Sequence, residues 1–372
     1  FLLLKLIFIM NICLLGNNLS NLVLAKNLLD REIKVDLYYK PTIEKSKITR
    51  TIGISENNII FFKKNKFNLE NISWKINNIK VFNEIDNKVE ILNFKSSDKA
   101  IFYLIKYKKL FNEISKFLKN KKNFKKYAIK KNSIKKIISN SKYDLIINSD
   151  NKNNIITNHF SNTINKDYNS TAYTCLIEHK FCKNNTATQI FTNIGPMAFL
   201  PISNYKTSIV FSAFDQLYSK KDIDFKEYIK KYNNHYIINS FSEIEKFKLK
   251  FSFARNYYYN NILLFGDALH QIHPLAGQGF NMTLRDIKIL LSLIDESQSL
   301  GLPIDKNILI KFENKIKHYN FIFGSGIDFI HEFFKFDNKL NNLVTKNIFN
   351  VLSKNKLFKN YLSNLADKGI NF

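Results

Sequence analysis

The sequence NILLFGDALHQIHPLAGQGFNMTLRD, residues 261–286, carries the strongest structural signal in the chain. Its apolar run from Ile262 to Phe265 has the length and composition of a buried strand. The run stops at Gly266-Asp267, so the Asp267 side chain would lie at the carboxyl end of the strand. Open α/β sheets bind ligands at that edge. Gly277-Gln278-Gly279 then predicts a turn before a helix from about Asn281 through Ile294. Because glycines precede that helix, its amino terminus is a candidate anion site.

Composition bounds the class of protein. The chain has 372 residues, enough for two domains and a large core, and 45% of them are hydrophobic, as in a globular protein. The formal net charge of +26 comes with a bias toward Lys, Asn, Ile and Phe along the whole length, and only four of the 57 basic residues are arginine. Charge scattered in this way argues against a nucleic-acid partner. A general attraction to anionic lipid surfaces stays open.

Cysteines and apolar segments indicate the compartment. Cys13, Cys175 and Cys182 show no CxxC spacing, so neither a zinc site nor a disulfide framework is predicted, which fits a reducing cytoplasm. The apolar run from Phe1 to Leu15 imitates a signal peptide, but Lys5 interrupts it and no small-residue cleavage site follows, so we expect a natural start at Met10. No other segment approaches the length of a membrane span. We expect a cytoplasmic protein, with peripheral association with the inner membrane as an option.

Two segments resemble a known family. Gly266-Asp267-Ala268, His273-Pro274, Gly277 to Asn281 and Asp286 are similar to the signature of the single-component FAD-dependent aromatic hydroxylases, most closely the ubiquinone-biosynthesis branch. The segment from Gly195 to Ile202, GPMAFLPI, resembles a second motif of that family. The resemblance implies an α/β fold with a Rossmann-like FAD-binding domain, an inserted antiparallel β-sheet substrate domain and C-terminal helices.

The resemblance also implies roles for individual residues. Asp267 would accept hydrogen bonds from the ribityl hydroxyls, although it could instead cap the turn after its strand. The amides of residues 277–281 would face the flavin's pyrimidine edge, and His273 and Pro274 would position the flavin without acting as acid or base. The implied cofactor-binding residues are Gly16, Asn18, Asn21, Arg50, Asp150, Gly266, Asp267, Pro274, Gly277, Gln278, Gly279 and Asn281. A surface position is the alternative for Arg50.

The amino-terminal region predicts the opening of a Rossmann unit, with a strand at 11–15, a helix through Leu29 and a strand at 34–38. Of the glycines in the family's G-x-G-x-x-G turn only Gly16 remains, and Asn18 and Asn21 stand at the other two positions. Asparagine enters positive φ readily, so the turn can form, but we expect both side chains to crowd the pyrophosphate and the packing of helix on strand. The family's ribose-binding acid would fall near Tyr39 and is absent.

The remaining pattern completes the expected organisation. Residues 103–118 predict an amphipathic helix, 143–147 a buried strand and 168–213 an antiparallel sheet. The chain after Asp286 predicts helices interrupted at 301–303 and 324–326, and its phenylalanines are read as core or as the wall of a lipid-substrate tunnel: Phe321, Phe323, Phe329, Phe333 and Phe334. We expect a discontinuous FAD-binding domain (10–68, 95–165 and 250–300), a substrate-binding β-sheet domain (69–94 and 166–249) and a C-terminal helical region (301–372).

The motifs favour cofactor chemistry. The sequence offers no serine elbow or paired-carboxylate motif, and His270 and His273 lack a third ligand, so we expect no metal. A flavin carries the hard chemistry itself and needs the protein to position and shield it. The resemblance implies an FAD-dependent monooxygenase that hydroxylates a polyprenylated phenol in ubiquinone biosynthesis with NAD(P)H and O2, at a membrane or in a biosynthetic complex. The alternatives are another FAD-dependent oxidoreductase of this fold, or a non-catalytic paralogue that serves as an assembly subunit.

Overall fold

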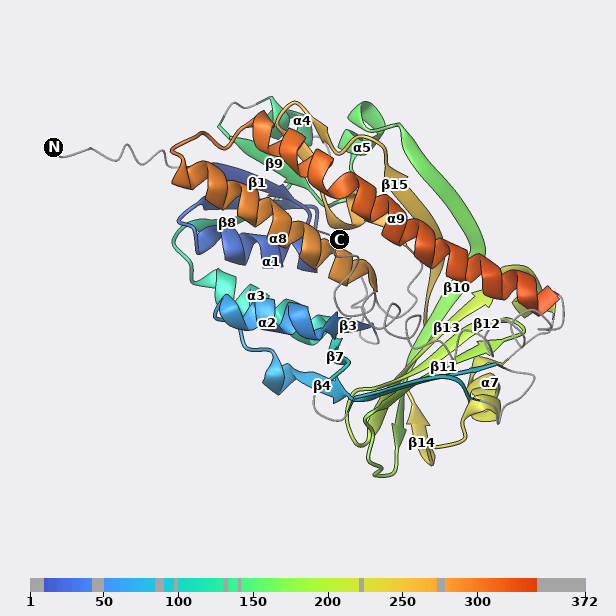
Figure 1. Ribbon diagram of the computed structural model, residues 1–372. Helices are drawn as coiled ribbons and strands as arrows, with labels where there is room; N and C mark the ends of the chain where they lie inside the picture. The colour runs from blue at the N-terminus through green and yellow to red at the C-terminus, as the bar shows by residue number, and fades with distance from the viewer. Residues whose placement is uncertain are drawn as a thin grey trace.

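The computed structural model describes residues 10–41, 50–83, 90–96, 100–129, 133–139, 142–220, 224–272 and 278–339. These residues form three β-sheets with helices packed around them, which confirms the expected mixed α/β fold (Figure 1). Two of the sheets are large, and the longest helix runs from one to the other. The exact domain boundaries remain a prediction.

The first sheet has the strand order β16-β17-β9-β1-β2-β8 and contains the Rossmann unit. Leu15 pairs with Asn148, and Asn148 pairs with Leu264, so three parallel strands end at the same level. Helices α1 (Leu19–Leu29) and α8 (Gln278–Ser299) pack against each other beside this sheet. The strand bounds are β1 Asn11–Leu15, β2 Lys34–Tyr39, β8 Phe124–Ala128, β9 Leu145–Asn148, β16 Tyr258–Tyr259 and β17 Ile262–Leu264.

The second sheet has the order β18-β15-β10-β13-β12-β11-β5-β6, with β14 beside β10, and all its pairs are antiparallel except β11 with β5. One face buries Phe211 against α7 (Phe225–Tyr232). The other face packs Phe251 and Phe253 against Met282 and Phe323 of the C-terminal helices. The bounds are β5 Asn78–Asn83, β6 Glu90–Lys95, β10 Thr163–His179, β11 Thr186–Thr192, β12 Gly195–Pro201, β13 Lys206–Phe214, β14 Ile238–Phe241, β15 Glu245–Ala254 and β18 His270–Gln271.

A small antiparallel sheet, β3-β7-β4, corrects one expectation. The helix predicted at 103–118 is α3, Tyr107–Lys119, and it begins four residues late because 103–106 belong to β7 (Phe102–Lys106). Tyr103, Leu104 and Ile105 are all buried, as suits a strand covered on both faces. The other elements are β3 Thr51–Ser55, α2 Glu56–Lys64, η1 Glu70–Ile72, β4 Ser73–Ile76, α4 Ser133–Ile138, α5 Asn154–His159, α6 Asp215–Lys220 and η3 Gly266–Ala268.

The C-terminal helix α9 (Lys306–Lys339) joins the two large sheets (Figure 1). The predicted break at 301–303 is confirmed, but the predicted break at 324–326 is wrong because α9 continues through it. A Cβ on Gly324 would lie 2.3 Å from Cζ of Phe253, so this glycine allows the helix to approach β15 closely. Phe323 is core and Phe321 is half exposed, while the side chains of the remaining tail phenylalanines, 329, 333 and 334, lie outside the described residues. None of the described helices is both long and apolar enough to span a bilayer.

Candidate functional site

The predicted site lies where β1, β9 and β17 end together. A Cβ on Gly16 (φ 109°) would lie 3.1 Å from Oγ of Ser149, and a Cβ on Gly266 (φ 55°) would lie 2.9 Å from Oγ of Ser20. Both glycines also have a positive φ, which other residues rarely adopt. The turn after β1 therefore packs on the turn after β9, and the turn after β17 packs on the first turn of α1.

Asn18 caps helix α1 and joins two of these turns. Its Oδ1 accepts a hydrogen bond from the backbone N–H of Asn21 at 3.1 Å, and its Nδ2 donates to the carbonyl oxygen and to Oγ of Ser149 at 3.1 and 2.8 Å. The backbone at Asn18 is extended, with φ −126° and ψ 171°, as is usual for a capping residue. The turn thus forms without positive φ at Asn18, contrary to the sequence-based expectation.

Asn21 lies fully buried under the turn. Its Nδ2 donates to the carbonyl oxygens of Leu15 and Gly16 at 3.0 and 2.8 Å, and its Oδ1 has no partner among the residues described. The side chain therefore bonds helix to strand. The expectation that it would crowd this packing is wrong, because the amide satisfies two carbonyls that end β1.

Tyr107 is a neighbour of the turn that no sequence motif marks. Its hydroxyl accepts a hydrogen bond from the N–H of Leu19 at 3.3 Å, and its ring lies 4.8 Å from the guanidinium of Arg50. Tyr107 and Asn18 thus accept hydrogen bonds from two amides in the first turn of α1, those of Leu19 and Asn21. Arg50 is thus next to the predicted site, stacked on Tyr107.

The turn after β9 uses its polar side chains locally. Oδ1 of Asp150 accepts from the N–H of Lys152 at 3.0 Å, and the N–H of Asp150 donates to Oδ1 of Asn148 at 3.1 Å. Nδ2 of Asn153 donates to the same Asn148 oxygen at 2.6 Å. Asp150 therefore sits at the predicted edge and shapes its own turn.

The start of α8 is fixed by Asn281. Its Nδ2 donates to the carbonyl of Gly53 at 3.0 Å, and its Oδ1 accepts from the N–H of Ser55 at 3.2 Å and from Nδ2 of Asn58 at 2.8 Å. These bonds tie the first turn of α8, which contains Gln278 and Gly279, to β3 and α2. The predicted residues His273, Pro274 and Gly277 lie outside the described part of the chain.

Asp267 differs from its neighbours because its side chain is exposed, and within the described ranges no group donates to its carboxylate. The preceding residue, Gly266, packs near Thr283 of α8. These residues therefore suit the flavin end of a dinucleotide, because the exposed carboxylate of Asp267 lies beside the start of α8. The turn after β1 suits the pyrophosphate less well. Asn18 and Tyr107 already accept hydrogen bonds from two amides of α1 that would otherwise bind an anion.

A buried cluster beneath α8 was not predicted, although it includes Asp286 of the motif. Nε2 of His270 lies 2.8 Å from Oδ2 of Asp286, and both side chains are almost fully buried. Nδ2 of Asn320 lies 3.3 Å from the same oxygen, which adds α9 to the cluster. His270, considered above as a metal ligand, has a carboxylate partner here.

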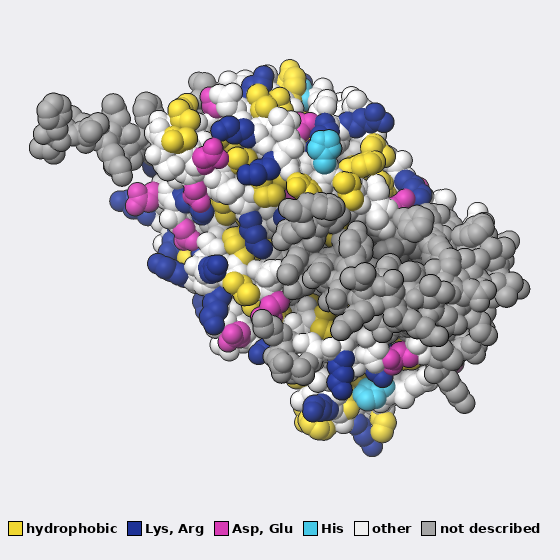
Figure 2. All heavy atoms as spheres, viewed as in Figure 1, with side chains coloured by type: hydrophobic (Ala, Val, Ile, Leu, Met, Phe, Trp, Pro, Cys, Tyr) yellow, Lys and Arg dark blue, Asp and Glu magenta, His cyan; other side chains and the backbone are white. Residues whose placement is uncertain are grey.

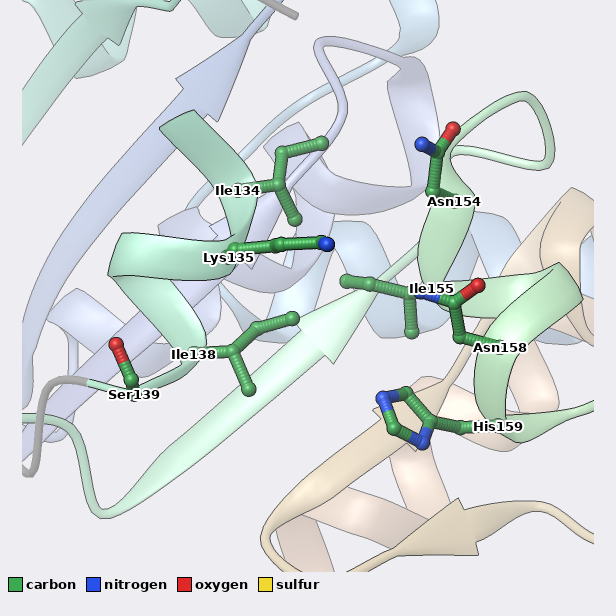
Figure 3. Close-up of a pocket in the computed structure, with 8 residues that line it drawn as sticks. All are labelled: Ile134, Lys135, Ile138, Ser139, Asn154, Ile155, Asn158 and His159. Atoms are coloured by element: carbon green, nitrogen blue, oxygen red, sulfur yellow. The ribbon is translucent and has the colours of Figure 1, made fainter. Parts of the chain in front are cut away.

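Two cavities lie away from this edge. One of about 530 Å³ separates α4 from α5, where Ile134 and Ile138 face Ile155 and His159 (Figure 3). Another of about 290 Å³ lies on the second sheet, between Phe199 and Tyr236. Neither of these two cavities is lined by a predicted site residue. The predicted site is therefore located by the turns that follow β1, β9 and β17.

Comparisons with known proteins agree with this geometry. A family model described as an FAD binding domain matches residues 158–297. The p-nitrophenol 4-monooxygenase from Pseudomonas putida DLL-E4 gives a TM-score of 0.72 at 10% identity, over 95% of this chain and 96% of that chain. A probable FAD-dependent monooxygenase from Pseudomonas aeruginosa, PqsL, gives 0.68 at 12% identity, over 88% and 96%. The fold and the matched segment are thus similar to those of FAD-dependent monooxygenases, in agreement with the resemblance in the motifs.

Several proteins that the chain resembles in sequence are named for ubiquinone biosynthesis. The ubiquinone biosynthesis monooxygenase COQ6 of Drosophila melanogaster is 26% identical over 230 residues, 50% of this chain and 48% of that protein. The 3-demethoxyubiquinol 3-hydroxylase of Escherichia coli (strain K12) is 28% identical over 180 residues, 43% of each. The chain thus spans less than half the length of these relatives.

Proposed function

We propose that the chain is an FAD-dependent monooxygenase that hydroxylates the ring of a polyprenylated phenol in ubiquinone biosynthesis, with NAD(P)H and O2 as co-substrates. The observation that carries this proposal is the exposed carboxylate of Asp267, at the end of β17 and next to α8, inside the segment matched by the FAD binding domain. Bound FAD would supply the redox chemistry that activates oxygen. The chain's own residues would bind the cofactor, orient it and exclude water.

Each part of the site has a role in this proposal. Asp267 would hold the ribityl hydroxyls through charge-assisted hydrogen bonds, and the first amides of α8, at Gln278 and Gly279, would face the flavin's pyrimidine edge. Asn281 would act as a positioning residue by fixing that helix start against β3. His273 and Pro274 would flank the flavin. The adenosine diphosphate end would lie over the turns that contain Gly16, Asn18, Asn21 and Asp150.

The substrate would enter between the second sheet and the C-terminal helices. The side chains in that layer are apolar and buried against one another, among them Phe251, Phe253 and Met282, so an apolar phenol would have to separate them to enter. We further propose that the chain works in the cytoplasm at the surface of the inner membrane, alone or with a ubiquinone-biosynthesis complex, and that the domain ranges given above are its functional units.

The cofactor part of the proposal is tested by purifying the protein and recording its absorption and the quenching of FAD fluorescence. We expect stoichiometric FAD binding, and Asp267→Ala should weaken it at least tenfold without changing stability, because the side chain is exposed. Glu113→Ala, at another exposed carboxylate on α3, is the control and should bind FAD normally. Normal FAD binding by Asp267→Ala would show that this carboxylate is not a ligand.

The substrate part is tested separately by following NADH or NADPH oxidation. We expect prenylated phenols to stimulate oxidation more than soluble hydroxybenzoates do. The opposite preference would refute the ubiquinone-pathway assignment and leave the monooxygenase class intact.

A second candidate function is supported by the capped turn. Because Asn18 and Tyr107 already bind the first amides of α1, the chain could serve as an assembly subunit that holds no FAD. A colourless protein that fails to quench FAD fluorescence would favour this candidate.

A further inference from the structure

We propose that one end of the second sheet is a docking surface for an anionic lipid membrane. This surface, the sheet tip, consists of residues 179–183, 203–206 and 236–238. It exposes three large side chains: Phe181 is 64% exposed, Tyr205 is 56% and Ile237 is 63%. Apolar side chains gathered on one patch of a soluble fold mark a site of interaction.

The three segments of the sheet tip are bonded side by side. The N–H of His179 donates to the carbonyl of Tyr205 at 2.9 Å, and the N–H of Lys180 donates to the carbonyl of Ile237 at 3.0 Å. The rings of Phe181 and Tyr205 meet edge to face, with centroids 5.5 Å apart. The exposed side chains therefore form one patch, at the end of the molecule where β14 begins (Figure 1).

A buried polar network holds these segments in place. Nε2 of His179 lies 3.0 Å from Oγ1 of Thr207, and the hydroxyl of Tyr236 donates to Oδ1 of Asn184 at 2.9 Å. Nδ2 of Asn184 donates to the carbonyl of Ser203 at 2.8 Å, so all three segments share the network. Because their backbones are fixed from below, the apolar side chains cannot fold back into the core.

Charge complementarity supports an anionic lipid surface as the partner. Lys180 and Lys183 are exposed beside the apolar side chains, and Lys206 pairs with Glu178 at 2.5 Å. The sheet tip itself contains no Asp or Glu. Figure 2 shows hydrophobic side chains and lysines or arginines intermixed at this end. Aromatic and aliphatic side chains surrounded by lysines suit the headgroup region of an anionic bilayer, where rings insert and lysines bind phosphates.

This inference deepens the membrane association in the proposed function, but its test needs neither FAD nor turnover. The full chain is mixed with vesicles of phosphatidylcholine alone, or of phosphatidylcholine and phosphatidylglycerol in equal parts, and bound protein is separated by flotation. We expect binding to the anionic vesicles only, and binding should fall as salt is raised. Binding to neither kind of vesicle would overturn the proposal and favour a protein partner. Equal binding to both kinds would also overturn it.

Variants then test whether the sheet tip is responsible. Phe181→Ser with Ile237→Ser should weaken binding on the order of tenfold, because two inserted apolar side chains are lost. Leu300→Ser with Leu302→Ser is the matched control, since these leucines are 63% and 48% exposed just beyond the carboxyl end of α8. Lys180→Gln with Lys183→Gln should also weaken binding on the order of tenfold, and Lys116→Gln with Lys119→Gln on α3, with the same loss of charge, should not. Equal losses in tip variants and controls would mean that binding is non-specific and would refute the assignment. Circular dichroism of each variant checks that it is folded.

Discussion

Only four arginines stand among the 57 basic residues, and three of them make specific contacts with a carboxylate, an aromatic ring or an amide. Arg31 binds both oxygens of Asp295, at 2.5 and 2.7 Å, and so joins α1 to α8. Arg50 stacks on the Tyr107 ring, and Arg285 lies 6.0 Å over the ring of Phe323 while it bonds Asn320. Lysine cannot form the bidentate contact of Arg31 with a carboxylate, although lysines elsewhere do lie over aromatic rings, as Lys121 does over Phe117.

The two asparagines of the amino-terminal turn should behave differently when each is replaced by glycine. Asn18→Gly costs only a few tenths of a kcal/mol as a cap and frees the N–H of Asn21, so we expect tighter FAD binding. Asn21→Gly removes the donor to two buried carbonyls and should lower the free energy of unfolding by about 1–3 kcal/mol. Urea unfolding and FAD fluorescence titration of each variant measure the two effects. An unchanged FAD dissociation constant for a folded Asn18→Gly would show that this turn does not contact the cofactor.

The buried side chain of Tyr236 should make the free energy of unfolding depend on pH in the alkaline range. Burial raises the pKa of Tyr236 from 10.0 to about 12, which outweighs the opposing hydrogen bond with Thr207. The unfolded chain therefore loses this proton at lower pH than the folded chain, so the contribution is intact below pH 10 and is lost as pH rises toward 12. We expect Tyr236 alone to contribute on the order of 2 kcal/mol to the fall in the free energy of unfolding across this window. The fall should be smaller in Tyr236→Phe and unchanged in Tyr205→Phe, an exposed control.

At the scale of elements, α9 depends on one glycine. Gly324→Ala would place its Cβ 2.3 Å from Cζ of Phe253, so helix and strand must separate, and we expect a loss of about 1–3 kcal/mol. Gly326→Ala is the matched control, because nothing lies within 4 Å of its Cβ. That change should stabilise the helix by up to about 1 kcal/mol. Thermal unfolding of both variants checks the contrast, and equal effects would contradict the packing argument.

Whether an element could be predicted from the sequence depends on whether local or distant residues determine it. The strand at 11–15 and the end of the helix at Leu29 follow from local apolar pattern and turn chemistry, so these bounds match. The interruption predicted at 324–326 was wrong because the reason for Gly324 lies in β15, distant in sequence. In the site, the motif identified Asp267, but Tyr107 contacts Leu19 across 88 residues and Asn18 contacts Ser149 across 131. Contacts of that range leave no local pattern to read.

For the whole molecule, cofactor binding and stability should be linked. A ligand that binds only the folded state stabilises it by about 2.7 kcal/mol at a hundred times its dissociation constant. We therefore expect added FAD to raise the melting temperature of the wild-type chain by several degrees and that of Asp267→Ala by less. Differential scanning fluorimetry at several FAD concentrations checks this. A shift independent of Asp267 would place the cofactor elsewhere.

The capped turn of α1 has a consequence for the life of the protein in the cell. Tyr107 and Asn18 bind two amides in the first turn of α1, and Asn21 binds a carbonyl at the end of β1, so we expect this unit to fold without a nucleotide. Synthesis and cofactor loading are then separate events. A cell short of riboflavin would keep a reserve of folded, empty chains, and these would become holoprotein as soon as the vitamin returned.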